Sequence, residues 1–306
     1  MKTKYIIGID LGGTNLKIAL LNTNYKIKSK QFLSTKCFKK KEALITAICD
    51  SIIVILAASN LSRNDILGVG LGLPGPINSK DGIVHFFPNI PGWKEVGLRK
   101  ILQAKLKIPV SLDNDANLMS LAEFRLGAAK ECKNAICITL GTGVGGGLII
   151  NGSLYRGSAY ASGEIGHVPI NEVGVRCNCG GEACLEAYVG NNRILEQARK
   201  AFGRNITLEE LSVLALRKNK LAVKIWDDFG RRLGIALTGV VNLLNLDALV
   251  IGGGVANAGN FLFNKIKQTI DERAMSVQAR HVKIFKAKLG SDAGMIGAAI
   301  LVKEGI

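Results

Sequence analysis

The chain has 306 residues, enough for one large domain or two medium ones with buried cores. Hydrophobic residues make up 48% and charged residues 21%, and the 36 glycines far outnumber the 6 prolines, which excludes a disordered or collagen-like protein. The net charge of +16 admits acidic partners such as nucleic acid or phosphorylated substrates, but the lysines are scattered, which favours a solvated surface.

The apolar runs and the cysteines indicate in which cellular compartment the protein functions. The longest apolar run, residues 52–58, is too short to span a membrane, and the N-terminus lacks the features of a signal peptide, so we expect no membrane partner and a cytoplasmic protein. Of the 7 cysteines, three crowd together at Cys177, Cys179 and Cys184. In a reducing compartment this clustering favours a metal site over a disulfide framework.

Strands and helices alternate along the chain, which predicts an α/β protein. In the first half we expect strands over 5–9, 16–21, 66–73 and 109–112, and helices over 42–59 and 116–126. In the second half we expect strands over 135–140, 147–150 and 248–251, and helices over 218–244 and 293–302. Each half opens with a strand, a turn containing Gly and Thr, and a second strand. This repetition suggests a duplicated fold with one phosphate loop from each half.

The two repeated turns can hold phosphate groups, because glycine lets backbone N–H groups approach the phosphate oxygens while the threonine hydroxyl donates a hydrogen bond. Asp10 can in addition orient a hydrated Mg²⁺. A simple hairpin turn is the alternative for the first turn taken alone. Three glycine turns at strand ends are harder to explain by structure only; they contain Gly12, Gly13 and Thr14, then Gly141, Thr142 and Gly143, and finally Gly252, Gly253 and Gly254.

An acidic pair with an amide follows the strand over 109–112, at Asp113, Asn114 and Asp115. Phosphoryl transfer needs a base within hydrogen-bond reach of the attacking hydroxyl, and an aspartate supplies one. An aspartate at the head of a helix is also a common N-cap, and this alternative is reasonable for one of the two aspartates.

A histidine and three cysteines have the composition of a zinc site. His167 lies ten residues before Cys177, and with Cys179 and Cys184 it completes four ligands for tetrahedral Zn²⁺. Because these ligands fill the coordination shell, the zinc would be structural. Glu164 and Glu186 flank this segment and would present acceptors for the hydroxyls of a sugar; surface glutamates are the alternative.

Together these motifs resemble the ROK family of repressors and sugar kinases, in the hexokinase and actin-like superfamily, over nearly the whole chain. The motifs are Asp10-Leu-Gly-Gly-Thr14, Pro74-Gly75, Asn114-Asp115-Ala-Asn117, the segment 140–147, Gly163-Glu-Ile-Gly-His167 and the segment 177–186. The resemblance implies two actin-like (ribonuclease H-like) α/β domains with a cleft between them. It implies a small domain over 1–115, on which a C-terminal helix of about 292–306 packs, and a large domain over 116–291 that carries the zinc loop.

The resemblance also implies roles for single residues. Asp115 would be the general base that takes the proton from the sugar 6-hydroxyl, and ATP with Mg²⁺ would lie at the two Gly-Thr turns, with Gly253 and Gly254 beside the adenosine. The implied sugar contacts are Gly75, Asn89, Asn114, Glu164, His167 and Glu186. One departure is Ala183, where the zinc motif usually has Gly; its methyl group is tolerated unless the position needs a positive φ.

The implied activity is ATP-dependent phosphorylation of a hexose, with glucose as the first choice. Kinases for N-acetylmannosamine, N-acetylglucosamine, mannose or fructose are the alternatives, and polyphosphate as donor is disfavoured by the cysteine cluster. A sugar-responsive transcriptional regulator is less favoured, because such family members carry an additional N-terminal helix-turn-helix domain and the first strand here begins near residue 5. We therefore expect no specific nucleic-acid partner, and a homo-oligomer, dimer or tetramer, as in many relatives.

Overall fold

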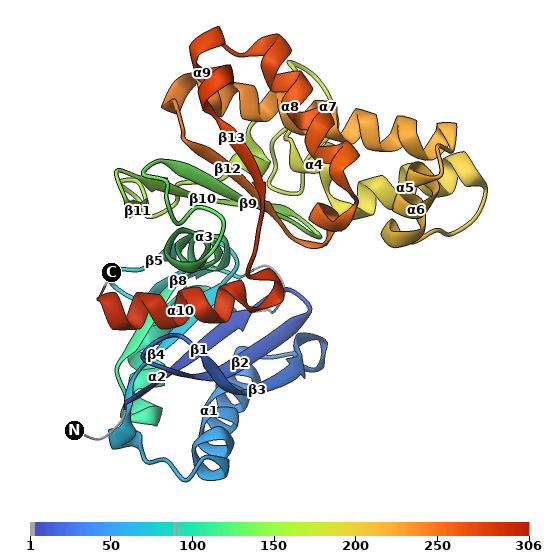
Figure 1. Cartoon of the computed structure of the whole chain (residues 1–306). Helices are drawn as coiled ribbons and strands as arrows, with labels where there is room; N and C mark the ends of the chain where they lie inside the picture. Colours follow the sequence, from blue (N-terminus) through green and yellow to red (C-terminus); the bar gives the residue numbers. More distant parts are fainter. Residues whose placement is uncertain (1–3, 88–89, 91, 306) are drawn as a thin grey trace. The chain divides into compact units, whose positions relative to one another are not determined.

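Two sheets with the same strand order organise the chain, which the computed structural model describes over residues 4–87, 90 and 92–305 (Figure 1). The chain divides into two compact units. Unit 1 comprises Met1–Arg125, Leu154–Ser162 and Ser291–Ile306, and unit 2 comprises Leu126–Ser153 and Gly163–Gly290. Among the described residues, no helix combines the length and the apolar character that a membrane span requires.

Unit 1 is built on a five-stranded sheet of order β3-β2-β1-β4-β8. Strands β1, β2 and β3 are antiparallel neighbours, whereas β4 and β8 run parallel to β1. The carboxyl ends of these parallel strands therefore lie at one edge of the sheet, where open α/β folds bind their ligands. The strands are β1 (Tyr5–Leu11), β2 (Asn15–Asn22), β3 (Ile27–Ser34), β4 (Ile66–Leu73) and β8 (Val110–Asn114).

Helices α1 (Lys41–Ala58) and α2 (Leu98–Leu106) contribute apolar side chains to the core of unit 1, which they share with the strands. A small antiparallel sheet of β5 (Ile77–Asn78), β6 (Ile83–Phe86) and β7 (Lys94–Val96) follows the end of β4. Helix α3 (Asp115–Leu126) begins directly after β8. The expected helix therefore starts one residue earlier than 116 and includes Asp115 in its first turn.

The C-terminal helix α10 (Ala293–Glu304) packs on β1, β4 and α3 through glycines that allow backbones to touch. A Cβ atom on Gly70 of β4 would lie 2.0 Å from the carbonyl oxygen of Ala298, and one on Gly297 would lie 1.8 Å from the carbonyl oxygen of Leu118. Side chains cannot be accommodated at these contacts unless the helix moves away. The close approach thus fixes α10 against the elements that carry Asp115.

Replacing Gly297 by Ala should lower the free energy of unfolding by about 2 to 4 kcal/mol, because α10 must shift to relieve the contact with Leu118. Urea unfolding followed by circular dichroism measures the change. Gly239→Ala is the control, since a Cβ on this exposed helical glycine meets nothing within 4 Å and the substitution favours the helix. Equal stability of Gly297→Ala and the wild type would contradict this packing.

A second five-stranded sheet, β11-β10-β9-β12-β13, repeats the strand order of the first. Strand β10 is antiparallel to β9, while β12 and β13 run parallel to it. This repetition agrees with the duplicated fold expected from the two Gly-Thr turns. The strands are β9 (Ala135–Leu140), β10 (Val144–Ile150), β11 (Ser153–Tyr155), β12 (Ala248–Gly252) and β13 (Lys283–Lys286).

The core of unit 2 contains side chains of this sheet and of the helices that follow the zinc motif, among them Trp226 and Phe229 of the longest helix, whose rings meet edge to face. That helix begins at Lys220 and not at 218, because the side chain of Asn219 accepts hydrogen bonds from the N–H groups of Leu221 and Ala222. The helices are α4 (Glu186–Val189), α5 (Asn191–Phe202), α6 (Leu208–Leu216), α7 (Lys220–Leu244), α8 (Asn260–Arg273) and α9 (Ser276–His281).

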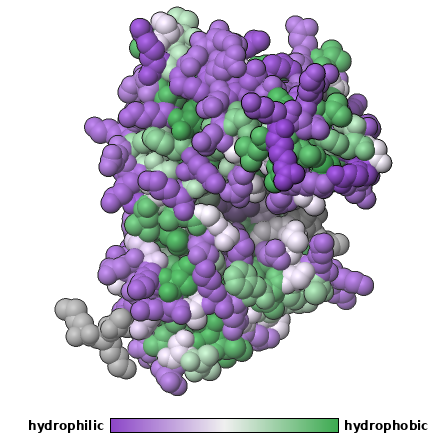
Figure 2. Space-filling view, turned by 45° about the vertical axis from the view of Figure 1, so that its right-hand side comes forward, coloured by the Kyte–Doolittle hydropathy of each residue, from purple (hydrophilic) through white to green (hydrophobic). Residues whose placement is uncertain are grey.

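The molecular surface is mixed in character. Hydrophilic residues cover most of the face shown in Figure 2, and hydrophobic residues lie among them in separate groups. This pattern accords with the scattered lysines of the sequence.

Candidate active site

The predicted base lies where β8 passes into α3, at the sheet edge where the parallel strands of unit 1 end. Asp115 is half-buried, and its Oδ1 accepts a hydrogen bond from the N–H of Ala116 at 2.8 Å. The side-chain oxygen of Asn114 accepts from the N–H groups of Ala116 at 2.9 Å and Asn117 at 3.3 Å. Asn114 therefore caps the first turn of α3. The start of this helix does not depend on the Asp115 side chain alone.

Asn114 also connects this corner to the turn after β4. Its Nδ2 donates to the carbonyl oxygen of Gly75 at 3.2 Å. Gly75 has a φ of +95°, and a Cβ there would lie 2.5 Å from the carbonyl oxygen of Phe86, so only glycine fits. Three of the predicted sugar-site residues, Gly75, Asn114 and Asp115, are thus brought together within unit 1. Asn89 lies outside the described residues.

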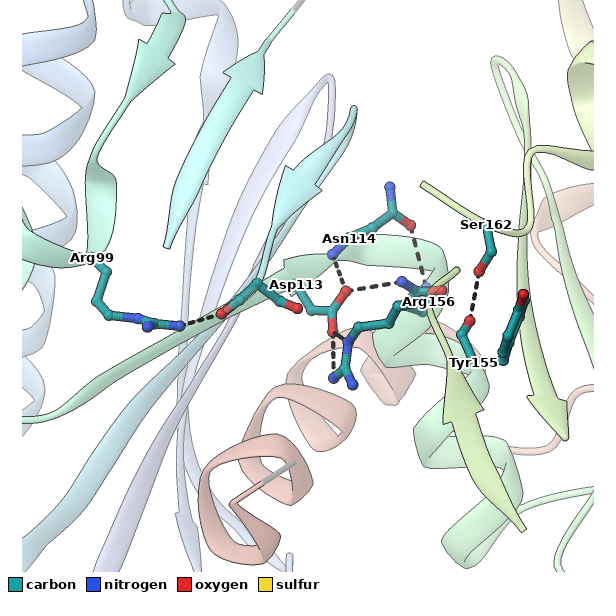
Figure 3. Close-up of polar contacts among 8 residues, drawn as sticks. Arg99, Asp113, Asn114, Tyr155, Arg156 and Ser162 are labelled. Carbon is teal, nitrogen blue, oxygen red and sulfur yellow. Dashed lines mark hydrogen bonds and ion pairs between the residues drawn. The ribbon is translucent and has the colours of Figure 1, made fainter. Parts of the chain in front are cut away.

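Asp113 is the buried member of the acidic pair, and sequence reasoning missed its partner, Arg156 (Figure 3). Nε of Arg156 donates to Oδ2 of Asp113 at 2.7 Å. The two residues are 43 positions apart. No local pattern could have predicted this contact. The sequence does show Arg156 between a strand and the Gly163-Glu164 motif, and its positive charge was the only signal that could have drawn attention to it.

The first predicted phosphate turn joins β1 to β2 and exposes Gly13 and Thr14 to solvent. Asp10 forms an ion pair with Lys17, whose Nζ lies 3.0 Å from Oδ2 of Asp10 and also donates to the carbonyl oxygen of Ser291 at 3.1 Å. Sequence reasoning missed Lys17. The hairpin register, which pairs Asp10 with Lys17 across the turn, was the signal that could have found it. The turn therefore carries a cation beside the predicted phosphate contacts.

The second predicted phosphate turn, residues 141–143, joins β9 to β10 in unit 2. The N–H of Gly141 donates to the carbonyl oxygen of Gly143 at 3.0 Å, and Thr142 is exposed. Gly253 lies against the end of β9, since a Cβ on it would be 2.1 Å from the carbonyl oxygen of Leu140. The two glycine turns predicted to contact ATP in this half are therefore neighbours at the carboxyl ends of parallel strands.

The predicted zinc ligands converge in unit 2. The nitrogen of His167 and the sulfurs of Cys177, Cys179 and Cys184 lie within 4.8 Å of one another. A tetrahedral Zn²⁺ with Zn–S bonds of about 2.3 Å holds its sulfur ligands roughly 3.8 Å apart. The Cys179 and Cys184 sulfurs are 3.7 Å apart, and Nδ1 of His167 is 3.7 Å from the Cys177 sulfur. The donor set therefore fits zinc in type and in spacing.

Protonation of the cysteine thiols and binding of a cation oppose each other. Burial, together with the neighbouring Cys179 and Cys177, raises the pKa of Cys184 to about 12 when no cation is bound, whereas the backbone N–H of Gly181 lowers the pKa of Cys179. Clustered thiols resist deprotonation because their negative charges would repel one another. A divalent cation reverses this effect by stabilising the thiolates.

Two glutamates flank the zinc ligands. Oε2 of Glu164 is 4.0 Å from Nε2 of His167, the ring nitrogen that faces away from the Cys177 sulfur. Partial desolvation raises the pKa of Glu164, His167 opposes the rise and Glu186 adds to it. The Glu164 side chain keeps 47% of its surface exposed. Solvent therefore partly screens these charges.

Glu186 connects the zinc motif to the second phosphate turn. Its Oε2 accepts a hydrogen bond from the N–H of Val144 at 2.8 Å, and a Cβ on Gly143 would lie 2.4 Å from the same oxygen. Within unit 2, one carboxylate thus joins the segment that carries the zinc ligands to the turn predicted to hold ATP phosphates.

Ala183 occupies a left-handed conformation with φ +57°, so the position does require a positive φ. An alanine pays a steric cost of about 1 kcal/mol there, because its Cβ approaches the following carbonyl oxygen. Ala183→Gly should therefore raise the free energy of unfolding by roughly 0.5 to 1 kcal/mol, measured by denaturant unfolding of the zinc-loaded protein. Ala187→Gly on the neighbouring helix should have the opposite sign, and a destabilised Ala183→Gly protein would contradict the strain.

Comparisons with known proteins show the family and the fold of the chain. The model of the ROK family matches residues 6–305. A glucokinase from Halalkalibacterium halodurans is 35% identical over 99% of this chain and 96% of its own length. A ROK family glucokinase from Streptomyces griseus, solved with glucose and AMPPNP, is 29% identical with a TM-score of 0.84, and the match covers 98% of this chain and 100% of that chain.

A ROK family transcriptional regulator, described as a homologue of the E. coli MLC protein, has a TM-score of 0.90 at 27% identity, over 99% of this chain and 78% of that chain. Kinases and regulators thus share this α/β architecture, and the actin-like fold expected from the motifs is confirmed. Because the family model spans nearly the whole chain, the chain belongs to the ROK family.

Proposed function

We propose that the chain is an ATP-dependent hexose kinase that converts glucose to glucose 6-phosphate, with Asp115 as the general base. The observation that carries this proposal is the position of Asp115, a half-buried carboxylate held by the Ala116 N–H at the edge where β1, β4 and β8 end. The similarity to a glucokinase over nearly the full length of both chains supports the same activity.

In the proposed reaction Asp115 accepts the proton of the sugar 6-hydroxyl as its oxygen attacks the γ-phosphorus of ATP. A bond forms between that oxygen and phosphorus, the bond to the bridging oxygen breaks, and ADP leaves with the electron pair. Most of the catalysis in such transfers comes from positioning and charge neutralisation. The hydrogen bond from Ala116 fixes the orientation of the Asp115 carboxylate, which favours transfer in one geometry.

We propose that the sugar hydroxyls are held by Asn114, Glu164, His167 and Glu186, with Gly75 beside them. The phosphates of ATP would contact the turns at Gly12, Gly13 and Thr14 and at Gly141, Thr142 and Gly143, with Gly253 and Gly254 near the adenosine. Asp10 would orient the water shell of Mg²⁺, which neutralises phosphate charge when bound. Lys17, already paired with Asp10, adds a second positive charge at this turn.

Zinc would be held by His167, Cys177, Cys179 and Cys184 and would be structural, because four protein ligands leave no open position for substrate. When bound, zinc would cross-link the chain segment that lies between Glu164 and Glu186. The ring of His167 would then bind zinc through Nδ1 and direct Nε2 toward Glu164 and the sugar.

A coupled assay of ADP release with ATP and a panel of sugars tests the proposal. We expect glucose to give the highest kcat/KM among glucose, mannose, fructose, N-acetylglucosamine and N-acetylmannosamine. A preference for an acetamido sugar or for fructose would correct the substrate, and turnover with polyphosphate but not ATP would correct the donor. No phosphoryl transfer to any sugar from either donor would overturn the kinase assignment.

A sugar-responsive regulator is the second candidate, because the regulator of the same family has a closely similar structure over this chain. A mobility-shift assay separates the two functions. A DNA shift that depends on sequence and on added sugar would support the regulator, whereas a shift that any DNA produces and that salt abolishes would reflect the net charge of +16 alone.

The location and the assembly of the chain stay predictions. We propose a cytoplasmic protein that forms a dimer or a tetramer. Light scattering coupled to size-exclusion chromatography would determine the mass of the particle, and a monomer at micromolar concentration would contradict the predicted assembly.

A further inference from the structure

A buried ion pair within unit 1 joins the end of β8 to the segment 154–162 (Figure 3). Nε of Arg156 donates to Oδ2 of Asp113 at 2.7 Å, and Nη2 lies 2.7 Å from the same oxygen. The side chain of Asp113 is 2% exposed and that of Arg156 is 15% exposed. A buried ion pair contributes little net stability compared with an apolar pair of the same shape. Two nitrogens of Arg156 on one carboxylate oxygen do, however, constrain the position of both side chains.

At the Asp113 end, the pair reaches the predicted sugar and proton-transfer residues. Oδ1 of Asp113 accepts hydrogen bonds from the backbone N–H of Asn114 at 2.7 Å and from Nδ2 of Asn117 at 2.9 Å. Asn117 lies in the first turns of α3, and Asp115 lies between these two donors in the chain. Arg156 neutralises the Asp113 carboxylate, which holds the junction between β8 and α3 through these hydrogen bonds.

At the Arg156 end, hydrogen bonds close the loop that follows, and Figure 3 shows the one between Ser162 and Tyr155. The N–H of Ser162 donates to the carbonyl oxygen of Arg156 at 3.1 Å, and the Ser162 hydroxyl donates to the carbonyl oxygen of Tyr155 at 2.6 Å. Gly163 and Glu164 follow Ser162 directly. An anchor at Arg156 therefore fixes the point from which the chain continues to Glu164.

We propose that Arg156 is a positioning residue for sugar binding. Through Asp113 it holds Asn114 and the start of α3, and through the closed loop 155–162 it sets the chain that enters the Glu164 motif. This inference rests on the proposed function, because it assumes that Asn114 and Glu164 contact the sugar. One ion pair then orders two sugar contacts that are far apart in the sequence.

Arg156→Met tests this role by the separation of KM from kcat. We expect the KM for the sugar to rise about tenfold or more while the KM for ATP stays within about twofold, because a small displacement of positioning groups weakens sugar binding first. A purely structural role would lower only the fraction of active protein, so kcat would fall and both KM values would stay unchanged. Arg156→Lys keeps the charge but not the planar fork, and should restore the sugar KM to within roughly threefold of the wild type.

The matched control is Arg125→Met. Arg125 also places Nε and Nη2 on a carboxylate of unit 1, Glu304, at 3.0 Å and 2.8 Å, but at the other end of α3 and with more exposed side chains. Its loss should leave both KM values unchanged. If Arg156→Met does not fold, the double variant Asp113→Asn, Arg156→Met removes the unpaired buried carboxylate, and we expect it to fold with the sugar KM still raised.

Hydrogen exchange of the substrate-free protein separates this inference from the proposed function. In Arg156→Met the amides of Asn114 and Ser162 should exchange faster than in the wild type, whereas Arg125→Met should not change them. A wild-type protein that phosphorylates no sugar would refute the kinase, and with it the assumption on which the inference rests. Phosphorylation of a sugar by the wild type, combined with an unchanged sugar KM and unchanged exchange in Arg156→Met, would overturn the role of Arg156 alone.

Discussion

Asp115→Asn should lower kcat for sugar phosphorylation by about 10³-fold, because an amide cannot accept the proton of the attacking hydroxyl and a general base contributes roughly 10² to 10⁴ in rate. The KM for the sugar should change little, since Asn keeps the shape of the side chain and its oxygen can still accept the Ala116 N–H. Steady-state kinetics with ADP detection measures kcat, and calorimetric titration of the sugar measures binding.

Asp50→Asn is the control for this experiment. Asp50 is an exposed carboxylate on α1 of the same unit, so its loss changes the net charge equally without touching the predicted base. We expect its kcat to equal that of the wild type. An Asp115→Asn protein with near-normal turnover would show that another group accepts the proton.

Removal of zinc should strongly affect both the stability of the protein and its binding of sugar. The purified protein should contain one Zn²⁺ per chain by elemental analysis, and Cys184→Ala should lose it, because a tetrahedral site with three remaining ligands binds far more weakly. We expect a lower unfolding temperature and a sugar KM raised by about tenfold or more, since the metal would no longer hold His167, which lies beside Glu164. Cys132→Ala is the control, as this half-buried cysteine of unit 2 lies outside the ligand cluster.

The zinc site should also depend on pH in a defined direction. Thiols must lose their protons to bind zinc, and without a cation burial raises the pKa of Cys184 to about 12. Binding therefore releases protons, and the apparent zinc affinity should rise as the pH rises from 6 to 8. Competition with a chromophoric chelator measures this affinity, and an affinity that falls with rising pH would exclude thiolate ligands.

Most elements named from the sequence are present, and the boundary differences have local causes. Strand β10 begins at Val144 and not at 147, because Gly145, Gly146 and Gly147 pair with β9 although glycine is a poor strand former. Strand β3 was not predicted. Its residues alternate between half-buried and exposed positions at the sheet edge, so its sequence carries no apolar pattern that would mark it as a strand.

Patterns within short segments predict the parts of the candidate site that are themselves local. The Gly-Thr turns, the Asp115 position after a strand and the His167 and cysteine spacing each depend on neighbours a few residues away, because backbone geometry and metal-ligand distances constrain short stretches of chain. The family membership and the actin-like fold followed from the order of these motifs and are confirmed by the family model and the solved relatives.

The tertiary structure decided the contacts between distant segments. The pair of Arg156 with Asp113, the bond from Val144 to Glu186 and the backbone contact of Gly297 with Leu118 join residues far apart in the chain. Many charged and small residues of the sequence could have formed such contacts, and only the folded chain selects among them through distance and burial. The positive φ of Ala183 belongs to the same class, because the surrounding loop imposes a conformation that alanine itself disfavours.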